Sequence, residues 1–593
     1  MITSTDAPPA VLHGELTPDG NTLVLIGVGP DPAIATMAAW LQLMTPLIKP
    51  SDPPGALLLP ATWAAVVQLA AIFGPAWRPG PRLTEWLMAE TVRRTPAGGA
   101  LGFDPPEGLV PRPYQVEGAL MIGALGRALL FDEPGTGKTI TTILGLLERT
   151  TAGHRIDPVI VIAPASVVDP WVQAWQNWAP HLRVNAWRGN PEHRRRLSAR
   201  PEGTAAHVVV ASYDTARMDA AKNGPLAKLN ARSVVVDECH LIKSAHAARS
   251  VAARRLAKRA EHFVALSGTP ITHHPGDLWP TLEALAPLAW PSGERWKARY
   301  CTTIPGDYSA KVIGLNTATE QEMRTTLLGQ HRRVAKADVL TQLPPKVYSV
   351  RQVELPAPYR KAYDQLENDM LAELPDGTEL SVMSVLAQLT RLQQLASAAT
   401  DVIVTTERDD DGLERERTEV RLKAPSWKAD ALLEVLTERP GEPVVAFAPS
   451  RQLIVLAGQL AEGKGLQVGY VMGGQSMRDR TDTVEAFQRG KLDLLCVTTG
   501  AGGVGLTLTA AKTVVFLQRP WSLVEASQAE DRCHRIGSEI HDSIEVIDIV
   551  ATKTIDTRIR AVLHEKAGQL ADLLQDKRIV TELLGGSTLR KAS

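Results

Sequence analysis

Short, uninterrupted apolar runs separated by helix-length segments recur along this chain of 593 residues. A run that is apolar at every position lacks the alternation of a half-exposed strand and is typical of a parallel strand buried on both faces. Parallel neighbours need a crossover connection, which is usually a helix. The pattern therefore predicts an α/β fold built on doubly wound parallel sheets. The runs lie at residues 128–131, 159–164, 207–213, 233–238 and 263–270, and again at 443–450, 467–474, 492–499, 513–520 and 543–550.

The runs fall into two series, so we expect two similar sheet lobes. Three or four domains are expected for this length, at about 100–200 residues each. Between the series the pattern is mainly helical, and a charged stretch at 407–421 is expected to be an exposed loop or hairpin. The predicted division is a small α/β accessory domain, lobe one, a helical inter-lobe insertion, lobe two and a tail, at residues 1–105, 106–295, 296–425, 426–575 and 576–593.

The most apolar segment, residues 55–74, has the length that a membrane span needs. Pro60 interrupts it, and we expect instead a strand at Ala56–Leu59 followed by a helix that ends at Gly74. The chain starts without a basic and apolar leader, and none of its four cysteines forms a C-x-x-C pair. We therefore expect a reducing cytoplasmic setting, with no membrane partner and no structural zinc.

The stretch DEPGTGKT, residues 132–139, lies between an apolar run and a helical pattern. Gly135 and Gly137 permit the tight backbone that points N–H groups at phosphates. Lys138 is placed to reach the β- and γ-phosphates, and the hydroxyl of Thr139 to hold Mg²⁺. The stretch opens with Asp132, where the general phosphate-loop pattern has glycine. The motif predicts a nucleotide site, and a plain glycine-rich turn beside a lysine is the weaker interpretation.

A second acidic motif, VVVDECH, ends a later apolar run at residues 234–240. Asp237 at a strand end is a typical Mg²⁺ ligand, and Glu238 beside it can polarise an attacking water. Two carboxylates on a buried strand are otherwise costly, although an exposed strand end is the alternative. With the phosphate loop, this pair predicts hydrolysis of a nucleotide with Mg²⁺ held by Thr139 and Asp237.

A DExH box that follows such a loop resembles helicase superfamily two, and the resemblance implies that both lobes are RecA-like. RPYQVEG (112–118) resembles the adenine-reading segment, and LSGTPITHHPGDLW (266–279) the segment that couples nucleotide state to movement. In lobe two, TTGAGGVGLTLTAA (498–511) and QAEDRCHRIG (528–537) resemble the fifth and sixth motifs. The sixth implies arginine fingers at Arg532 and Arg535, which stabilise charge on the phosphoryl group.

The Asp-Glu opening of the phosphate loop resembles one branch in particular, the Swi/Snf-type ATPases. DECHLIKS (237–244), HRRVAKADVLTQLPPK (331–346) and the segment at 552–574 resemble this branch too, so the similarity covers about residues 106–575. LPPK and the compact inter-lobe region are most similar to the HepA-related annealing helicases. Departures from the branch are Pro134, Cys239 and Ser538, and none of them removes a catalytic group.

The resemblance assigns further residues by position. It implies nucleotide contacts from Gln115, Asp132, Glu133, Pro134, Gly135, Thr136, Gly137, Lys138, Thr139, Gly505 and Gln528. It implies coupling of nucleotide state to movement by His240, Ser267 and Thr269. Phosphate contacts with DNA are implied for Ser166, Ser212, Ser450 and Thr498, so that sequence is not read. Trp171, Trp175 and Trp178 recur at helical spacing; stacking on bases is one interpretation, and a packed helix face is the favoured one.

Members of this branch move along double-stranded DNA without separating its strands, so that is the expected function here, on double-stranded or forked DNA in replication, repair or recombination. A strand-separating DNA or RNA helicase is one alternative. A DNA-binding scaffold with a dead ATP site is another, although every catalytic group named above is present. Net charge is −1, which excludes a strongly basic nucleic-acid coat but permits a local basic groove. The residue usage suggests a bacterial or phage source, with the protein at the nucleoid.

Overall fold

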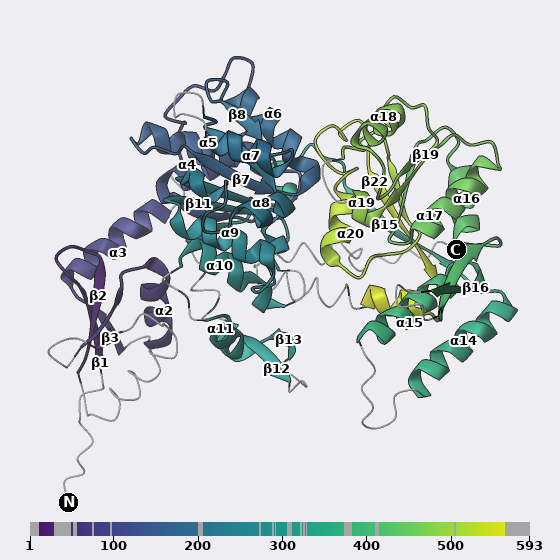
Figure 1. Ribbon diagram of the computed structural model, residues 1–593, viewed down its shortest axis with the longest axis horizontal. Helices are drawn as coiled ribbons and strands as arrows, with labels where there is room; N and C mark the ends of the chain where they lie inside the picture. The colour runs from purple at the N-terminus through teal and green to yellow at the C-terminus, as the bar shows by residue number, and fades with distance from the viewer. Residues whose placement is uncertain are drawn as a thin grey trace, which may run out of the picture. The chain divides into compact units, whose positions relative to one another are not determined.

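We describe a computed structural model of the chain, which divides into two compact units, Met1–Val339 and Leu340–Ser593 (Figure 1). Each unit is described by itself. The division falls inside the expected inter-lobe insertion, and the five domain ranges given above stay a prediction. The structure describes residues 11–28, 49–50, 56–73, 76–94, 98–199, 205–271, 274–287, 290, 292–304, 311–320, 323, 327, 329–372, 382–408, 414–502, 506–561 and 563.

In its described residues, the accessory region at the start of the first unit is a five-stranded sheet with two helices. Its strand order is β3-β4-β2-β1-β5, with β1 and β5 parallel and the other pairs antiparallel. The strand and helix expected around Pro60 are confirmed, and none of the described helices is long and apolar enough to cross a bilayer. The elements are β1 (Val11–Leu16), β2 (Thr22–Val28), β3 (Lys49–Pro50), β4 (Leu57–Pro60), α2 (Trp63–Phe73), β5 (Trp77–Pro79) and α3 (Pro81–Arg94).

Lobe one is a seven-stranded, wholly parallel sheet in the order β14-β6-β11-β10-β7-β9-β8. All five strands predicted from the first series are confirmed. The sequence did not predict β8 (Val184–Ala186) and β14 (His331–Arg332), which are too short to form an apolar run. The other strands are β6 (Arg127–Leu130), β7 (Val159–Ala163), β9 (Val208–Ser212), β10 (Ser233–Asp237) and β11 (His262–Leu266).

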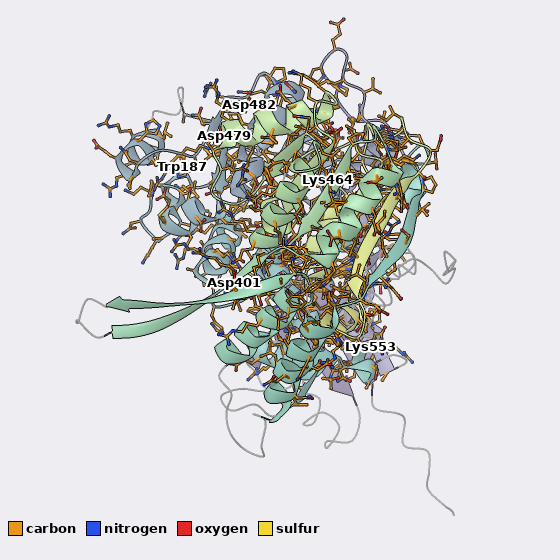
Figure 2. All side chains as sticks on the ribbon, turned by 90° about the vertical axis from the view of Figure 1, so that its right-hand side faces the viewer. Trp187, Asp401, Lys464, Asp479, Asp482 and Lys553 are labelled. Carbon is orange, nitrogen blue, oxygen red and sulfur yellow. The ribbon has the colours of Figure 1, made fainter. Side chains whose placement is uncertain are left out.

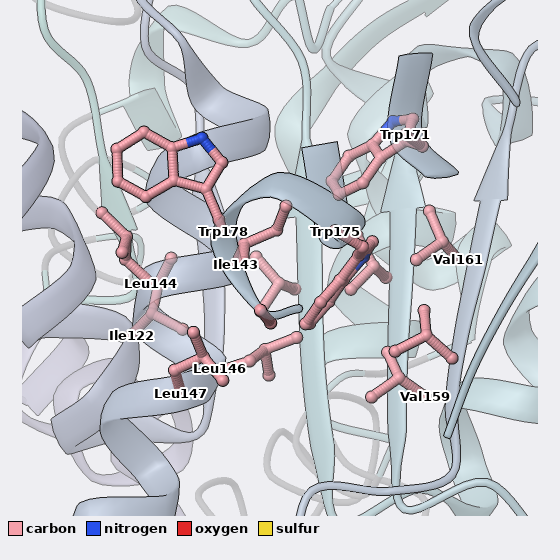
Figure 3. Close-up of a cluster of buried hydrophobic side chains, with 14 of the residues drawn as sticks. Ile122, Ile143, Leu144, Leu146, Leu147, Val159, Val161, Trp171, Trp175 and Trp178 are labelled. Atoms are coloured by element: carbon pink, nitrogen blue, oxygen red, sulfur yellow. The ribbon is translucent and has the colours of Figure 1, made fainter. Parts of the chain in front are cut away.

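Helices cover both faces of this sheet, as Figure 1 shows. The longer ones are α4 (Pro113–Leu125), α5 (Lys138–Thr151), α6 (Val168–Trp178), α7 (Pro191–Ser198), α8 (Tyr213–Asp219), α9 (Ala248–Arg259) and α10 (Trp279–Leu285). A further helix, α11 (Gly293–Tyr300), follows α10 and lies beside β12 and β13 instead (Figure 1). Trp171, Trp175 and Trp178 of α6 are only 1%, 0% and 8% exposed and pack into one core with α5 and β7 (Figure 3). The packed-face interpretation is therefore confirmed, and base stacking by these residues is excluded.

Lobe two is a six-stranded parallel sheet in the order β15-β22-β21-β18-β20-β19. All five strands of the second series are confirmed, whereas β15 was not predicted because its half-exposed residues do not form an apolar run. The strands are β15 (Lys346–Val353), β18 (Val444–Ala448), β19 (Val468–Val471), β20 (Leu494–Thr498), β21 (Thr513–Phe516) and β22 (Ile544–Ala551). The helices are α16 (Trp427–Glu438), α17 (Arg451–Glu462), α18 (Met477–Gln488), α19 (Thr499–Gly502) and α20 (Leu523–Glu530).

The segment expected to be a helical insertion also contains strands, which corrects that part of the prediction. A hairpin of β16 (Ala399–Arg408) and β17 (Glu414–Lys423) projects from lobe two, with Asp401 near its base (Figure 2). It starts earlier than the stretch at 407–421 because β-branched residues dominate 402–406. The remaining elements are β12 (Cys301–Ile304), β13 (Lys311–Leu315), α13 (Lys336–Val339), α14 (Ala357–Ala372) and α15 (Val382–Leu395).

A buried ion pair ties the segment after β22 to the body of lobe two. Lys428 is fully buried, and its Nζ lies 2.5 Å from Asp556 Oδ2 and donates to the Leu517 carbonyl at 2.9 Å. The same Asp556 oxygen accepts from the Ala551 N–H. A buried ammonium needs both a countercharge and hydrogen-bond acceptors. Asp556 provides the countercharge, so the ion pair holds the segment 552–556 against the body of lobe two.

Truncating Trp175 tests the core of lobe one. Trp175→Ala removes a fully buried ring and is expected to lower the free energy of unfolding by about 3–5 kcal/mol, measured by denaturant unfolding. Trp521→Ala in the second unit, where the side chain is 38% exposed, is the control and should cost about 1 kcal/mol or less. Equal losses in both variants would contradict the assigned core.

Candidate nucleotide-binding and hydrolysis site

Three neighbouring strands of lobe one end at the same edge of the sheet and carry the predicted motifs. The phosphate loop follows β6, the segment Ser267–Thr269 follows β11, and Asp237 is the last residue of β10. These strands lie side by side in the order β6-β11-β10, and all pairings are parallel. Their carboxyl ends therefore meet at one edge, where ligands bind in open α/β sheets.

Two glycines shape the phosphate loop. Gly135 and Gly137 have φ of 85° and 84°, a region that side chains other than glycine rarely adopt. A Cβ at position 137 would also lie 2.3 Å from Nε2 of Gln115. Nearby, a Cβ on Gly268 would meet Pro134 at 2.4 Å, so the segment after β11 packs directly against the loop.

Lys138 is the first residue of α5, which starts at the phosphate loop. Its Nζ donates to the carbonyls of Asp132 at 2.8 Å and Glu133 at 3.1 Å, and it forms no ion pair with any described residue. A helix N-terminus carries a positive partial charge, so an ammonium there lacks its natural counter-ion. The Lys138 ammonium, the N–H groups of the loop and the N-terminus of α5 together form a site suited to an anion. The triphosphate of ATP is an anion of this kind.

Gln115 and Tyr114 support the loop from behind. Gln115 Nε2 and Tyr114 Oη both donate to the Thr136 carbonyl, at 3.1 and 2.9 Å. Gln115 Oε1 accepts from the Arg112 N–H at the start of α4, and the residue is 4% exposed. In this conformation both polar atoms of the Gln115 amide are used to hold the loop. To contact adenine, as the resemblance implies, the amide would have to give up one of these hydrogen bonds.

Asp132 and Glu133 point away from the phosphate-binding side, toward a segment far along the chain. Asp132 is fully buried and pairs with Arg332, and Glu133 Oε2 accepts from the Lys336 N–H at 2.8 Å. Arg333 lies 3.8 Å from Glu133. Burial raises the pKa of Asp132 to about 6, against the lowering effect of Arg332. The structure thus adds Arg332 and Arg333 to the site, and no role for either was predicted.

Asp237 and Glu238 lie at the end of β10. Asp237 Oδ2 accepts from Trp171 Nε1 at 2.8 Å, and its Oδ1 accepts from the Glu238 N–H. Burial, followed by the neighbouring Glu238, raises the pKa of Asp237 to about 6, while Trp171 and the ammonium of Lys138 oppose the rise. Glu238 has φ of 50°, which is uncommon for a residue other than glycine and aims its side chain away from the strand.

The three residues implied in coupling form a chain of contacts with Glu238. His240 Nδ1 lies 3.2 Å from Glu238 Oε2 and 3.1 Å from Ser267 Oγ. Ser267 Oγ in turn accepts from the Thr269 N–H, and Ser267 N–H donates to the Leu130 carbonyl at the end of β6. The strand that carries the acids is thus connected, through one histidine, to the segment that packs on the loop.

The oxygen groups near the loop fit Mg²⁺. Thr139 supplies a hydroxyl and Asp237 a carboxylate, which are the hard ligands that Mg²⁺ takes alongside waters and phosphates. No group of three or more His, Cys, Asp or Glu side chains suited to a metal occurs in the described part of the chain.

The four residues with implied DNA contacts lie at or just after strand ends. Ser212 and Ser450 are helix N-caps whose Oγ atoms accept from the N–H groups of Thr215 and Leu453. Ser166 follows β7, and Thr498 is the last residue of β20. In each lobe they lie at the carboxyl edge of the sheet.

In lobe two, the predicted arginine fingers follow α20. Arg535 Nη1 donates to the Leu506 carbonyl at 3.2 Å, and burial lowers its pKa. The Arg532 carbonyl accepts from the Leu508 N–H, so this segment is fastened to the loop before β21. Gln528 lies buried in α20, and Gly505 lies outside the described residues.

The fold and motifs define a helicase-type protein with two α/β lobes, and comparisons with known proteins agree. Residues 97–400 match the family model of the SNF2-related domain, and residues 427–537 match the helicase conserved C-terminal domain. The first match alone covers more than half of the chain. The chain therefore belongs to the SNF2-related, Swi/Snf-type family of ATP-hydrolysing enzymes in helicase superfamily two.

Curated relatives are longer than this chain. It is 30% identical over 487 residues to the putative ATP-dependent helicase/translocase YwqA of Bacillus subtilis, covering 80% of this chain and 50% of the relative. It is 26% identical to the ISWI chromatin-remodeling complex ATPase ISW1 of Saccharomyces cerevisiae, covering 76% and 39%. The Sulfolobus solfataricus SWI2/SNF2 ATPase core in complex with dsDNA is 20% identical, with a TM-score of 0.36 and coverage of 80% and 97%. The chain spans about half or less of the length of these curated relatives.

Trp171→Phe tests the support of Asp237. The variant keeps an aromatic ring in the core but removes the indole N–H that donates to Asp237. A hydrogen bond to a charged group is worth about 1.5–3 kcal/mol, so we expect kcat/KM for ATP hydrolysis to fall roughly tenfold or more. Trp175→Phe is the matched control, because Trp175 Nε1 has no partner among the described residues. Equal losses in both variants would assign the effect to packing.

The pKa of Asp132 gives stability a pH dependence. Folding raises this pKa from 3.8 to about 6, so the folded chain binds the proton of the Asp132 carboxyl group more tightly than the unfolded chain does. Proton binding therefore stabilises the folded state at low pH, and this contribution to the free energy of unfolding is lost as the pH rises from about 4 through 6. Relative to Asp132→Asn, the natural chain should lose about 1 kcal/mol of unfolding free energy between about pH 5 and pH 7. Denaturant unfolding at several pH values measures this, and parallel curves would contradict it.

Proposed function

We propose that this chain is an Mg²⁺-dependent ATPase that uses hydrolysis to move along double-stranded DNA without separating the strands. The observation that carries the proposal is that Lys138 and Asp237 lie at the same edge of the sheet of lobe one. Lys138 follows the phosphate loop after β6, and Asp237 is the last residue of β10, two strands away in a parallel sheet. A phosphate-binding cation and a metal-binding acid thus share one edge of the sheet.

The chemistry follows from the residues at that edge. Lys138 and the loop N–H groups bind the triphosphate, and Thr139 and Asp237 hold the ion that neutralises its charge. Glu238 orients the attacking water and accepts its proton, and His240 holds the Glu238 carboxylate through the contact described above. Arg532 and Arg535 complete the site when lobe two closes on lobe one, and stabilise charge on the transferred group.

The contacts to DNA are proposed to be phosphate contacts from the carboxyl edges of both sheets. Ser212 and Ser450 begin helices, where free N–H groups and a positive partial charge favour phosphate. Ser166 and Thr498 lie at the ends of other strands. Binding of this kind does not read sequence and weakens as salt rises.

A relative's name supports an ATP-driven motor. The Bacillus subtilis relative is called a putative ATP-dependent helicase/translocase. We further propose action on double-stranded or forked DNA in replication, repair or recombination, at the nucleoid of a bacterial or phage-infected cell. The placement beside the HepA-related annealing helicases is part of this proposal.

ATP hydrolysis measured with no nucleic acid, single-stranded DNA, duplex DNA, forked DNA and RNA tests the proposal. We expect at least tenfold stimulation by duplex or forked DNA, and loss of at least a hundredfold in Lys138→Ala, because the cation that binds the β- and γ-phosphates is gone. Lys464→Met, an exposed site in lobe two, is the control and should keep the activity of the natural chain (Figure 2).

A second measurement separates movement from unwinding. Displacement of a third strand from a DNA triplex reports movement along a duplex, whereas release of a labelled strand from a partial duplex reports separation. We expect the first and not the second. Strand release, or stimulation by RNA alone, would favour the strand-separating alternative, and no turnover at all would favour the scaffold.

A further inference from the structure

Residues 331–346 contact both elements that carry the proposed ATP chemistry. Their first part, Arg332 to Lys336, lies against the phosphate loop in the first unit. Their last part, Pro344 to Lys346, lies against the arginine segment in the second unit. In the sequence, this stretch was recognised only by its resemblance to the Swi/Snf-type branch, and no role was predicted for it.

At the first end, the backbone extends the parallel pairing of β14 and β6 into the loop itself. The N–H groups of Leu129, Phe131 and Glu133 donate to the carbonyls of residues 330, 332 and 334, at 3.1, 2.8 and 3.0 Å. The first residues of the phosphate loop therefore continue the backbone pairing of β6 with β14. Any movement of these residues must move β14 with it, or break these hydrogen bonds.

Two arginines lock this end in place. Arg332 pairs with the buried Asp132 and donates to the Tyr114 carbonyl at 2.7 Å, which connects it to the residues behind the loop. Arg333 donates to the carbonyls of Phe131 at 3.0 Å and Gly268 at 3.1 Å. It thereby bridges the start of the loop and the segment between Ser267 and Thr269.

At the other end, the same stretch holds the residues around the arginine fingers. His534 Nε2 lies 2.9 Å from the Pro344 carbonyl. Lys346 Nζ lies 3.2 Å from Glu530 Oε2 and 3.5 Å from Asp531 Oδ1. Asp531 directly precedes Arg532, so Lys346 holds the backbone next to that arginine.

We infer that residues 331–346 are the connector through which the phosphate loop and the arginine segment are coupled, with Arg332, Arg333 and Lys346 as positioning residues. Seven residues, 337–343, separate the two anchored ends, and the rest of α13 takes up part of them. A short, partly helical link transmits displacement better than a long loop. The inference rests on the proposed ATPase function and adds the route by which its two halves communicate.

A double-mutant cycle tests the connector in the full chain with duplex DNA. Arg332→Gln and Lys346→Met remove one anchor each, and the partners described above for the two residues are different. If each acts locally, their effects on kcat should multiply, as they do for distant independent sites. If both act through one connector, we expect each to lower kcat about tenfold and the double variant to lose about tenfold as well.

Three controls sharpen the cycle. Lys346→Met should leave the affinity for a fluorescent ADP analogue within about twofold, because Lys346 lies in lobe two and acts through other residues. Lys346→Arg should restore most of kcat, since it keeps the charge beside Glu530. Lys464→Met replaces Lys346→Met in a parallel cycle and should add nothing to the loss caused by Arg332→Gln.

The outcomes are distinct. If the two losses of kcat multiply, to about a hundredfold in the double variant, the connector hypothesis is wrong. It is also wrong if either single variant keeps the kcat of the natural chain. If Arg332→Gln does not fold, Asp132→Asn removes the same charge pair and takes its place in the cycle. Absence of ATP hydrolysis in the natural chain would instead defeat the proposed function, before the cycle is measured.

Discussion

The parallel pairing of β6, β11 and β10 is the constraint on which the chemistry of lobe one depends. Strands that run in one direction end at one edge, so three segments that are remote in sequence meet there without any contact being specified among them. Burial on both faces then makes the edge rigid, because each strand is held by helices as well as by its neighbours. What remains for the loops is local shape, which Gly135, Gly137 and the left-handed Glu238 provide.

Asp132, in the place where phosphate loops generally have glycine, has a structural explanation. Its carboxylate is buried under the loop and paired with Arg332, so it belongs to the scaffold rather than to the ligand side. Burying such a pair gains little stability, since the cost of desolvating both charges offsets their attraction. It does select one conformation, because removing either partner leaves an uncompensated buried charge. The opening of this loop is thus specified by a segment that follows 200 residues later in the chain.

The sequence predicted the parts of the fold that depend on local pattern. All ten apolar runs are strands, and the motif residues Lys138 and Asp237 lie where strand ends place them. It did not predict β14 or β15, because a two-residue strand and a half-exposed edge strand leave no apolar run. Nor did it predict the roles of Arg332 and Arg333. Their partners are fixed by tertiary folding, and two adjacent arginines in a charged stretch look like any solvated surface.

Lobe two supports its arginine segment in the same way as lobe one supports its loop. Arg519 is buried between Asp548 and Glu530, at 2.7 and 2.8 Å, and those acids raise its pKa against the effect of burial. Glu530 also accepts from Tyr348 on β15, so strands β15 and β22 both hold the end of α20. Each half of the proposed ATP chemistry is therefore held within its own lobe. Since packed cores do not deform gradually, we expect the change that accompanies hydrolysis to fall on the chain between the lobes, where residues 337–343 lie between the two sets of anchors.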